Sequence, residues 1–153
     1  MSDCRRQAHI DAPIEVVWDL IADIGRHPEW WPRVVEIECD RLGEGCNYRQ
    51  VTRTPVGVDE MDLHIDSMQE PDEFRIHCVN TGTFVRFALT QAQGGTFVDG
   101  RMGMDPDGLF NRAFDATAGR IYFRRWLAAS LDAMAEAATE RAEAGARTAG
   151  GGS

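Results

Sequence analysis

The sequence predicts an α+β fold in which a curved, seven-stranded antiparallel sheet wraps around one long C-terminal helix. Two observations favour this architecture. Between residues 34 and 104, short stretches with strand-like alternation follow one another, separated by turns that contain glycine or proline. The segment from Leu109 to about Ala144 is rich in Ala, Leu, Glu and Arg and has helical spacing. Because an antiparallel sheet must hide its apolar face, this segment is expected to cover it.

One strand and two short helices are expected before the meander. Alternation predicts a strand over Arg5–Asp11. A helix is expected over Pro13–Ala22, where the proline suits a first helical turn and the apolar residues recur at helical spacing. In residues 23–32, two prolines and a glycine permit only a short helical segment.

Six further strands are expected, because turn residues divide the remaining stretches at hairpin-like distances. Their ranges are Val34–Arg41, Cys46–Thr54, Val58–Gln69, Phe74–Asn80, Thr83–Gln91 and Thr96–Met104. The length of 153 residues fits a single core, so we expect one ligand-binding domain over residues 1–144. The glycine-rich residues 145–153 are expected to form a flexible tail, and whether its final Gly-Gly-Gly-Ser is native stays open.

Composition narrows the possible partners and location. The net charge of −9 disfavours nucleic acid, because phosphate backbones attract basic surfaces. No apolar run approaches the roughly 20 residues that span a bilayer, and no signal-like region follows the first residues. We therefore expect a soluble, cytoplasmic protein that is a monomer or homodimer. The four widely spaced cysteines are interpreted as reduced thiols, with no metal site and no cofactor.

Alternation also assigns side chains to the two faces of the sheet, and the inward set is expected to line a ligand cavity together with one side of the long helix. Glycine and flexible methionines among these residues favour adaptable space. The inward strand residues are Met61, Leu63, Ile65, Phe74, Ile76, Val85, Phe87, Val98, Gly100 and Met102, and the helix residues are Phe110, Phe114 and Ile121. Trp126 is expected to pack at the edge of this helix stripe.

The third strand of the chain allows two registers. If it is regular, Arg49, Val51 and Arg53 point inward, and an arginine guanidinium there could bind a carboxylate or polarise a carbonyl. If a bulge near Gly45 shifts the register by one residue, Tyr48 lies inside and both arginines face water. The sequence leaves both open.

Aromatic and histidine residues give further candidates. Trp30 is expected to stack on a planar ligand, whereas Trp31 is expected to anchor a short helix to the core. His64 and His77 occupy paired strands and could act as acid and base, but their alternation places them on the outer face.

Two motifs carry a family resemblance. Residues 12–23, APIEVVWDLIAD, and residues 27–32, HPEWWP, resemble the START-like helix-grip superfamily, in particular its bacterial polyketide cyclase/dehydrase and lipid-transport branch. The resemblance implies a pocket between the sheet and the C-terminal helix. It also implies members that bind lipids, hormones or aromatic polyketides. No residue-by-residue match to the catalytic set of the cyclases is found.

Three functions follow as hypotheses. The first is binding of a small hydrophobic or aromatic molecule. The second is a polyketide cyclase, aromatase or dehydrase that works without metal or nucleotide. The third is a protein-interaction adaptor, which an exposed apolar patch would favour.

Overall fold

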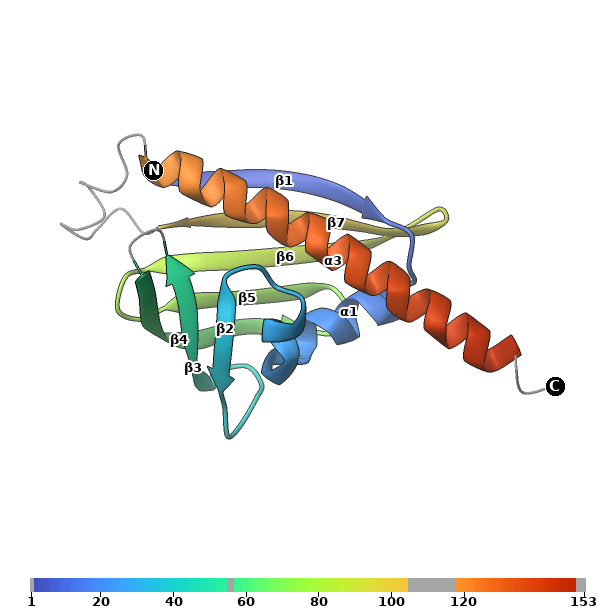
Figure 1. Ribbon diagram of the computed structural model, residues 1–153, viewed down its shortest axis with the longest axis horizontal. Helices are drawn as coiled ribbons and strands as arrows, with labels where there is room; N and C mark the ends of the chain where they lie inside the picture. Colours follow the sequence, from blue (N-terminus) through green and yellow to red (C-terminus); the bar gives the residue numbers. More distant parts are fainter. Residues whose placement is uncertain (1, 55–56, 105–117, 151–153) are drawn as a thin grey trace.

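The computed structural model describes residues 2–54, 57–104 and 118–150, and within them the expected α+β architecture is present. Seven strands form one antiparallel sheet, and a long helix packs across it (Figure 1). The elements are β1 (Ser2–Ile10), α1 (Ile14–Ala22), the 3₁₀ helix η1 (Ile24–Glu29), β2 (Val34–Glu38), β3 (Asn47–Thr54), β4 (Gly57–Gln69), β5 (Glu73–Cys78), β6 (Thr83–Ala92), β7 (Gly95–Met104) and α3 (Ala118–Gly150).

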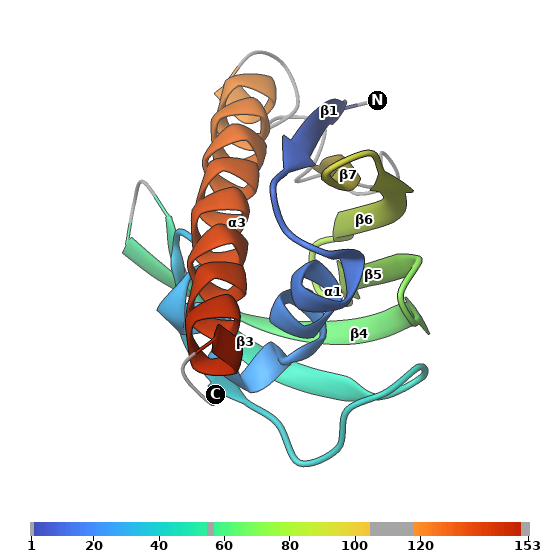
Figure 2. The same ribbon diagram turned by 90° about the vertical axis from the view of Figure 1, so that its right-hand side faces the viewer.

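The sheet order is β1-β7-β6-β5-β4-β3-β2, so consecutive strands from β2 to β7 are neighbours and β1 joins the far edge. In Figure 2 the sheet curves around α3, and α1 lies at one end of the same concave side. α3 contacts β1, β7 and α1. The predicted fold class is confirmed, and its curvature creates the layer between sheet and helix where the core lies.

Alternation along the strands assigned most of the inner face correctly. The predicted inward residues Met61, Leu63, Ile65, Phe74, Ile76, Val85, Phe87, Val98 and Met102 are all buried. Their neighbours on the same strands face water, as expected for an antiparallel sheet with one solvated face.

The long helix differs from its prediction in two respects. Its buried stripe consists of Phe123, Trp126, Leu127, Ser130, Leu131, Met134 and Ala138. Ile121, which was expected to line a cavity, is 45% exposed, and that prediction is wrong. Trp126, expected at the edge, is 4% exposed. The reason is the apolar surface area that α3 buries. A helix rotated so that Phe123, Trp126 and Leu127 face the sheet buries more apolar surface than one rotated so that Ile121 and two alanines face it.

The end of α3 also differs, because the helix continues to Gly150 where a flexible tail was expected from residue 145. One glycine in a helix costs only about 1 kcal/mol, and the alanines on both sides of Gly145 favour the helix. Up to residue 147, Ala138 is the last fully buried residue, and the later turns project past the sheet (Figure 1). The start of the predicted helix, including Phe110 and Phe114, lies outside the described residues.

Two tryptophans fasten α3 to the segment that follows η1. The Trp31 indole Nε1 donates a hydrogen bond to Ser130 Oγ on α3 at 2.9 Å. The Trp126 indole Nε1, from α3, donates to the Pro32 carbonyl oxygen at 2.8 Å. Ser130 Oγ in turn donates to the Trp126 carbonyl oxygen at 2.6 Å. We refer to these residues, Trp31, Pro32, Trp126 and Ser130, as the indole clamp.

The outer face carries a row of four arginines on adjacent strands: Arg75 pairs with Arg86, Arg86 with Arg101, and Arg101 with Arg5. Like charges in directly opposite positions destabilise a sheet unless they are compensated. Here each arginine has a carboxylate partner, in the pairs Arg5–Asp99, Arg75–Asp66, Arg86–Glu73 and Arg101–Asp3. The charges of this arginine row are therefore compensated by carboxylates on the same face.

Gly100 on β7 packs closely against side chains of α3. A Cβ atom at this position would lie 2.9 Å from Leu127 Cδ1 and 3.5 Å from Leu131 Cδ1. The expectation that Gly100 lines ligand space is therefore corrected, because the two leucines of α3 occupy the room that the glycine leaves.

We expect Gly100→Ala to destabilise the fold by about 1–3 kcal/mol, because the buried leucines have little space into which to move. Urea unfolding followed by circular dichroism measures this. Gly145→Ala on α3 is the matched control: a Cβ atom there would have no other atom within 4 Å, so stability should be unchanged or slightly higher. Equal effects of the two changes would contradict the close-packing argument.

His27 in η1 is a buried titratable group. Its side chain is 0% exposed, and its Nε2 lies 2.7 Å from the Ile21 carbonyl oxygen, to which the neutral ring donates. Burial lowers the pKa of His27 from 6.5 to about 4, although the hydrogen bond to Ile21 opposes the shift. The neutral form therefore belongs to the folded state.

We expect stability to fall as the pH drops from about 6.5 to about 4, because over this range the unfolded chain binds a proton at His27 that the folded chain excludes. Each pH unit within this window costs about 1.4 kcal/mol. In His27→Gln, which retains a donor for Ile21, the free energy of unfolding should fall by about 2 kcal/mol less between pH 7 and pH 4.5. Parallel pH profiles of the two proteins would refute this assignment.

Candidate functional site

A small cavity lies between the sheet and α3. Its volume is about 10 Å³, which is the room that one water molecule needs. Six apolar side chains and two polar ones line it. The apolar residues are Trp31, Met61, Leu63, Ile76, Val85 and Trp126, and the polar residues are Gln50 and Thr83.

The two indoles of the clamp form one wall. The ring centroids of Trp31 and Trp126 are 6.4 Å apart, and the rings are tilted by 38°. Trp30, predicted to contact the ligand, stacks on Trp31 with centroids 5.4 Å apart, and it is absent from the described cavity lining. Trp31, expected to be only an anchor, therefore both anchors α3 and faces the cavity.

The opposite wall depends on the register of β3, which the structure resolves in favour of the bulged alternative. Tyr48 pairs with Leu63 and Gln50 with Met61, and these residues are buried. Backbone hydrogen bonds from Gly45 to Ile65 and from Ile65 to Cys46 set this pairing at the hairpin. Gln50 consequently reaches the cavity.

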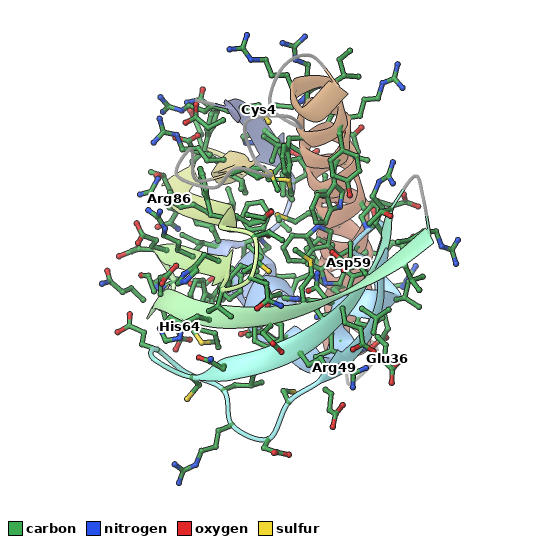
Figure 3. The ribbon with its side chains drawn as sticks, turned by 90° about the vertical axis from the view of Figure 1, so that its left-hand side faces the viewer. Cys4, Glu36, Arg49, Asp59, His64 and Arg86 are labelled. Carbon is green, nitrogen blue, oxygen red and sulfur yellow. The ribbon has the colours of Figure 1, made fainter. Side chains whose placement is uncertain are left out.

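The inward orientation of Arg49 and Val51 is wrong, for the same reason. Figure 3 shows Arg49 on the outside of the sheet, where it pairs with Glu38 at 3.0 Å and with Glu60. A shift of one residue exchanges the two faces of a strand. No guanidinium from this strand therefore reaches the interior.

The interior polar groups of β3 are neutral. Gln50 Nε2 donates to Thr52 Oγ1 at 2.9 Å, while Gln50 Oε1 has no hydrogen-bond partner within the described residues. The Tyr48 hydroxyl is also buried without a partner there, and burial raises the pKa of Tyr48, so its phenol stays protonated. This part of the interior offers hydrogen bonding without charge.

Four of the predicted site residues line the cavity, namely Met61, Leu63, Ile76 and Val85. Five others, Ile65, Phe74, Phe87, Val98 and Met102, are buried but absent from its described lining. Sequence reasoning missed Trp31, Gln50, Thr83 and Trp126 as cavity residues. If the register of β3 with Tyr48 inside had been chosen, alternation would have placed Gln50 on the inner face as well.

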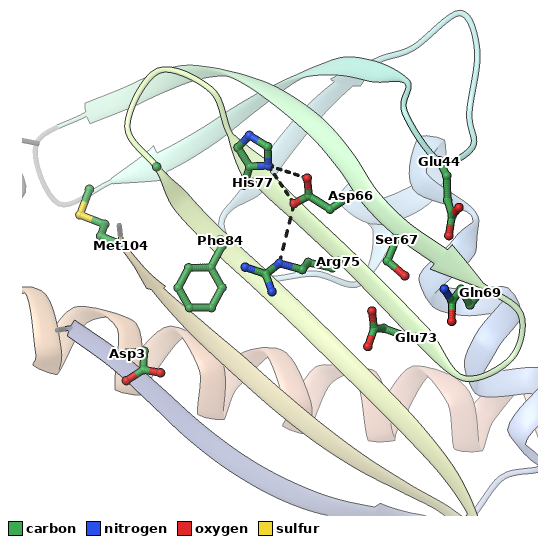
Figure 4. Close-up of a pocket in the computed structure, with 11 residues that line it drawn as sticks. Asp3, Glu44, Asp66, Ser67, Gln69, Glu73, Arg75, His77, Phe84 and Met104 are labelled. Atoms are coloured by element: carbon green, nitrogen blue, oxygen red, sulfur yellow. Dashed lines mark hydrogen bonds and ion pairs between the residues drawn. The ribbon is translucent and has the colours of Figure 1, made fainter. Parts of the chain in front are cut away.

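A larger hollow of about 840 Å³ opens on the outer face of the sheet (Figure 4). Asp66 is one of its lining residues and contacts His77 at 2.8 Å and Arg75 at 3.8 Å. The β4 bulge between Ile65 and Ser67 aims this carboxylate across the strand. Because Asp66, Asp3 and Glu73 each pair with a neighbouring cation and the hollow is open to solvent, we consider it a solvated surface network. His64 and His77 face outward as predicted, with ring centroids 5.4 Å apart.

Neither a metal cluster nor a membrane-spanning helix is found in the described segments. No group of three or more His, Cys, Asp or Glu side chains there could hold a metal ion. None of the helices within those segments is both long and apolar enough to cross a membrane. The cysteines are free thiols, and Cys39 and Cys46 border a shallow outer groove next to Arg49.

Comparison with solved structures shows the same fold in proteins of low sequence identity. The di-domain ARO/CYC StfQ from the steffimycin biosynthetic pathway is 18% identical with a TM-score of 0.68, covering 95% of this chain and 51% of StfQ. A protein from Nitrosomonas europaea is 11% identical with a TM-score of 0.70, covering 91% of this chain and 95% of its own. A protein of unknown function from Staphylococcus aureus is 12% identical with a TM-score of 0.71, covering 92% and 95%.

At the level of sequence, no curated protein matches the chain. A family described as polyketide cyclase/dehydrase and lipid transport matches residues 1–139, which include β1 to β7 and the buried part of α3. This match spans the elements that build the cavity and the indole clamp. The chain therefore belongs to the polyketide cyclase/dehydrase and lipid transport family.

Proposed function

We propose that the chain binds a small hydrophobic or aromatic molecule between the sheet and α3. The observation that carries this proposal is the chemistry of the cavity wall: two indoles and four aliphatic or thioether side chains surround a buried amide oxygen with no partner in the described residues. Apolar walls with a few fixed polar groups are typical of small-molecule sites. The family match supports the same class of function.

The unpartnered amide oxygen supports a ligand for an energetic reason. A buried acceptor that makes no hydrogen bond costs the fold about 1–3 kcal/mol. Gln50 is 3% exposed, and the cavity beside it has room for only about one water molecule. A bound molecule that satisfies the oxygen would recover part of this cost.

The cavity is smaller than an aromatic ring, so binding requires side chains to move. Met61 is the best candidate, because rotation about its Cγ–Sδ bond moves the terminal methyl group while Sδ keeps its hydrogen bond from Thr52. The indoles are less free, since both are hydrogen-bonded in the clamp. We therefore expect the site to widen on the β4 side and to accept single-ring compounds first.

Binding is tested with toluene and para-cresol, followed by calorimetry and by the NMR resonances of the indole N–H groups. We expect saturable binding that shifts the Trp31 and Trp126 resonances, while Trp18, which is absent from the cavity lining, changes less. No saturable binding of either compound would refute the proposal.

A pair of matched variants locates the site. Val85→Ile adds a methylene group at the cavity wall and should weaken binding about tenfold or more. Val98→Ile makes the same change at a buried position outside the described lining and should leave affinity nearly unchanged. Equal affinities of the two variants would place the ligand elsewhere.

A second candidate function is cyclisation or dehydration of an aromatic polyketide intermediate, which the family description and the resemblance to StfQ favour. The described cavity wall holds no ionisable side chain, so any proton transfer there would rely on neutral groups. Incubation with a linear poly-β-ketone thioester, followed by mass spectrometry for the loss of water, tests this function. An adaptor role is less favoured, because the exposed large apolar residues of the described segments are distributed over β2, β4, β7, α3 and two loops.

A further inference from the structure

A chain of hydrogen bonds behind the cavity wall determines which end of the Gln50 amide faces the cavity. The chain runs from Gln50 to Thr52 on β3 and then to Met61 on β4. Gln50 Nε2 lies 2.9 Å from Thr52 Oγ1, and Thr52 Oγ1 lies 3.2 Å from Met61 Sδ. Gln50 is 3% exposed, Thr52 2% and Met61 8%, so water competes little with these bonds.

The structure gives this hydrogen-bond chain a direction. The Thr52 hydroxyl donates its proton to Met61 Sδ, a thioether sulfur that carries no proton and can only accept. The lone pairs of Thr52 Oγ1 then face Gln50 and accept from its Nε2. The amide must then turn its NH₂ group toward Thr52, and its oxygen becomes the open end.

Thr83, the other polar residue of the cavity wall, does not restrict the ligand to a hydrogen-bond donor or to an acceptor. Thr83 Oγ1 lies 2.9 Å from Thr81 Oγ1, and either hydroxyl can be the donor in this pair. A hydroxyl rotates to suit its partner, so Thr83 can adapt to a ligand that either donates or accepts. The orientation of the Gln50 amide therefore decides whether the cavity prefers a ligand that donates a hydrogen bond or one that accepts it.

We infer that the site selects a neutral ligand that donates a hydrogen bond, such as a phenol or another hydroxyl-bearing ring, to Gln50 Oε1. The inference rests on the proposed function and names its ligand class. A carboxylate is disfavoured, because it would place negative charge against an amide oxygen, and no cationic side chain stands on the described wall. A bare ketone or quinone is disfavoured as well, since it brings a second acceptor.

Four single-ring probes separate these ligand classes: toluene without a polar group, para-cresol as donor, acetophenone as acceptor and para-toluate as anion. In the parent protein we expect para-cresol to bind about fivefold more tightly than toluene, which is the effect of one neutral hydrogen bond. Acetophenone and para-toluate should bind more weakly than para-cresol. Calorimetry supplies the dissociation constants.

Two variants assign the preference to Gln50. Gln50→Leu should bring the affinity ratio of para-cresol to toluene close to one while toluene still binds, which also shows that the variant folds with its cavity. Tyr48→Phe is the matched control, because it removes an unpartnered buried hydroxyl from the same strand at a position outside the described lining. Its ratio should equal that of the parent protein.

Met61→Leu tests the hydrogen-bond chain itself. Without the sulfur, the Thr52 proton is released to donate to Gln50 Oε1, and the amide can then rotate to present its NH₂ group to the cavity. The preference should move from para-cresol toward acetophenone, with toluene affinity as the reference. If Met61 has a purely steric role, all three affinities should change by the same factor, and that result would refute the proposed hydrogen-bond chain.

The outcomes distinguish this inference from the function on which it rests. If toluene and para-cresol both fail to bind, the proposed function fails and the ligand class fails with it. If both bind with equal affinity, or if para-toluate binds most tightly, the proposed function stands and the inference is overturned.

Discussion

The reciprocal hydrogen bonds of the indole clamp are the interaction on which the rest of the structure depends. The indole N–H of each tryptophan donates a hydrogen bond to the segment that carries the other tryptophan. These two bonds join α3 to the residues after η1. A buried indole N–H without an acceptor costs about 1–3 kcal/mol, which makes other helix positions unfavourable. The same two rings are walls of the cavity. Folding and ligand space therefore share their most important contacts.

The sequence predicted the strands and their faces well because one side of the sheet is solvated and the other buried. This difference gives alternation along Met61 to Ile65 and along Phe74 to Cys78 its meaning. Alternation could not choose the register of β3, because that choice depends on how the turn with Gly43 and Gly45 closes. It also misjudged the rotation of α3, where Trp126 is buried in place of Ile121 because the largest side chains decide the buried stripe.

The candidate site was less predictable than the fold, because its polar residues depend on the register of β3, which the sequence left open. With Arg49 inside, the interior would have held a cation suited to an anionic ligand. With Gln50 inside, it holds a neutral amide whose polarity is set by a threonine and a methionine. The family match indicates the pocket and leaves the choice of ligand to such details. Two neighbouring residues on one strand thus correspond to two different ligand chemistries.

The projecting end of α3 has a practical consequence. Between Ala138 and residue 147 the helix buries no further side chain completely, and residues 143–147 are exposed. With a rise of about 1.5 Å per residue, these C-terminal turns of α3 extend away from the cavity. A dye, affinity tag or surface linker joined there would stand clear of the core, so the molecule can be immobilised or labelled without disturbing the packing between helix and sheet.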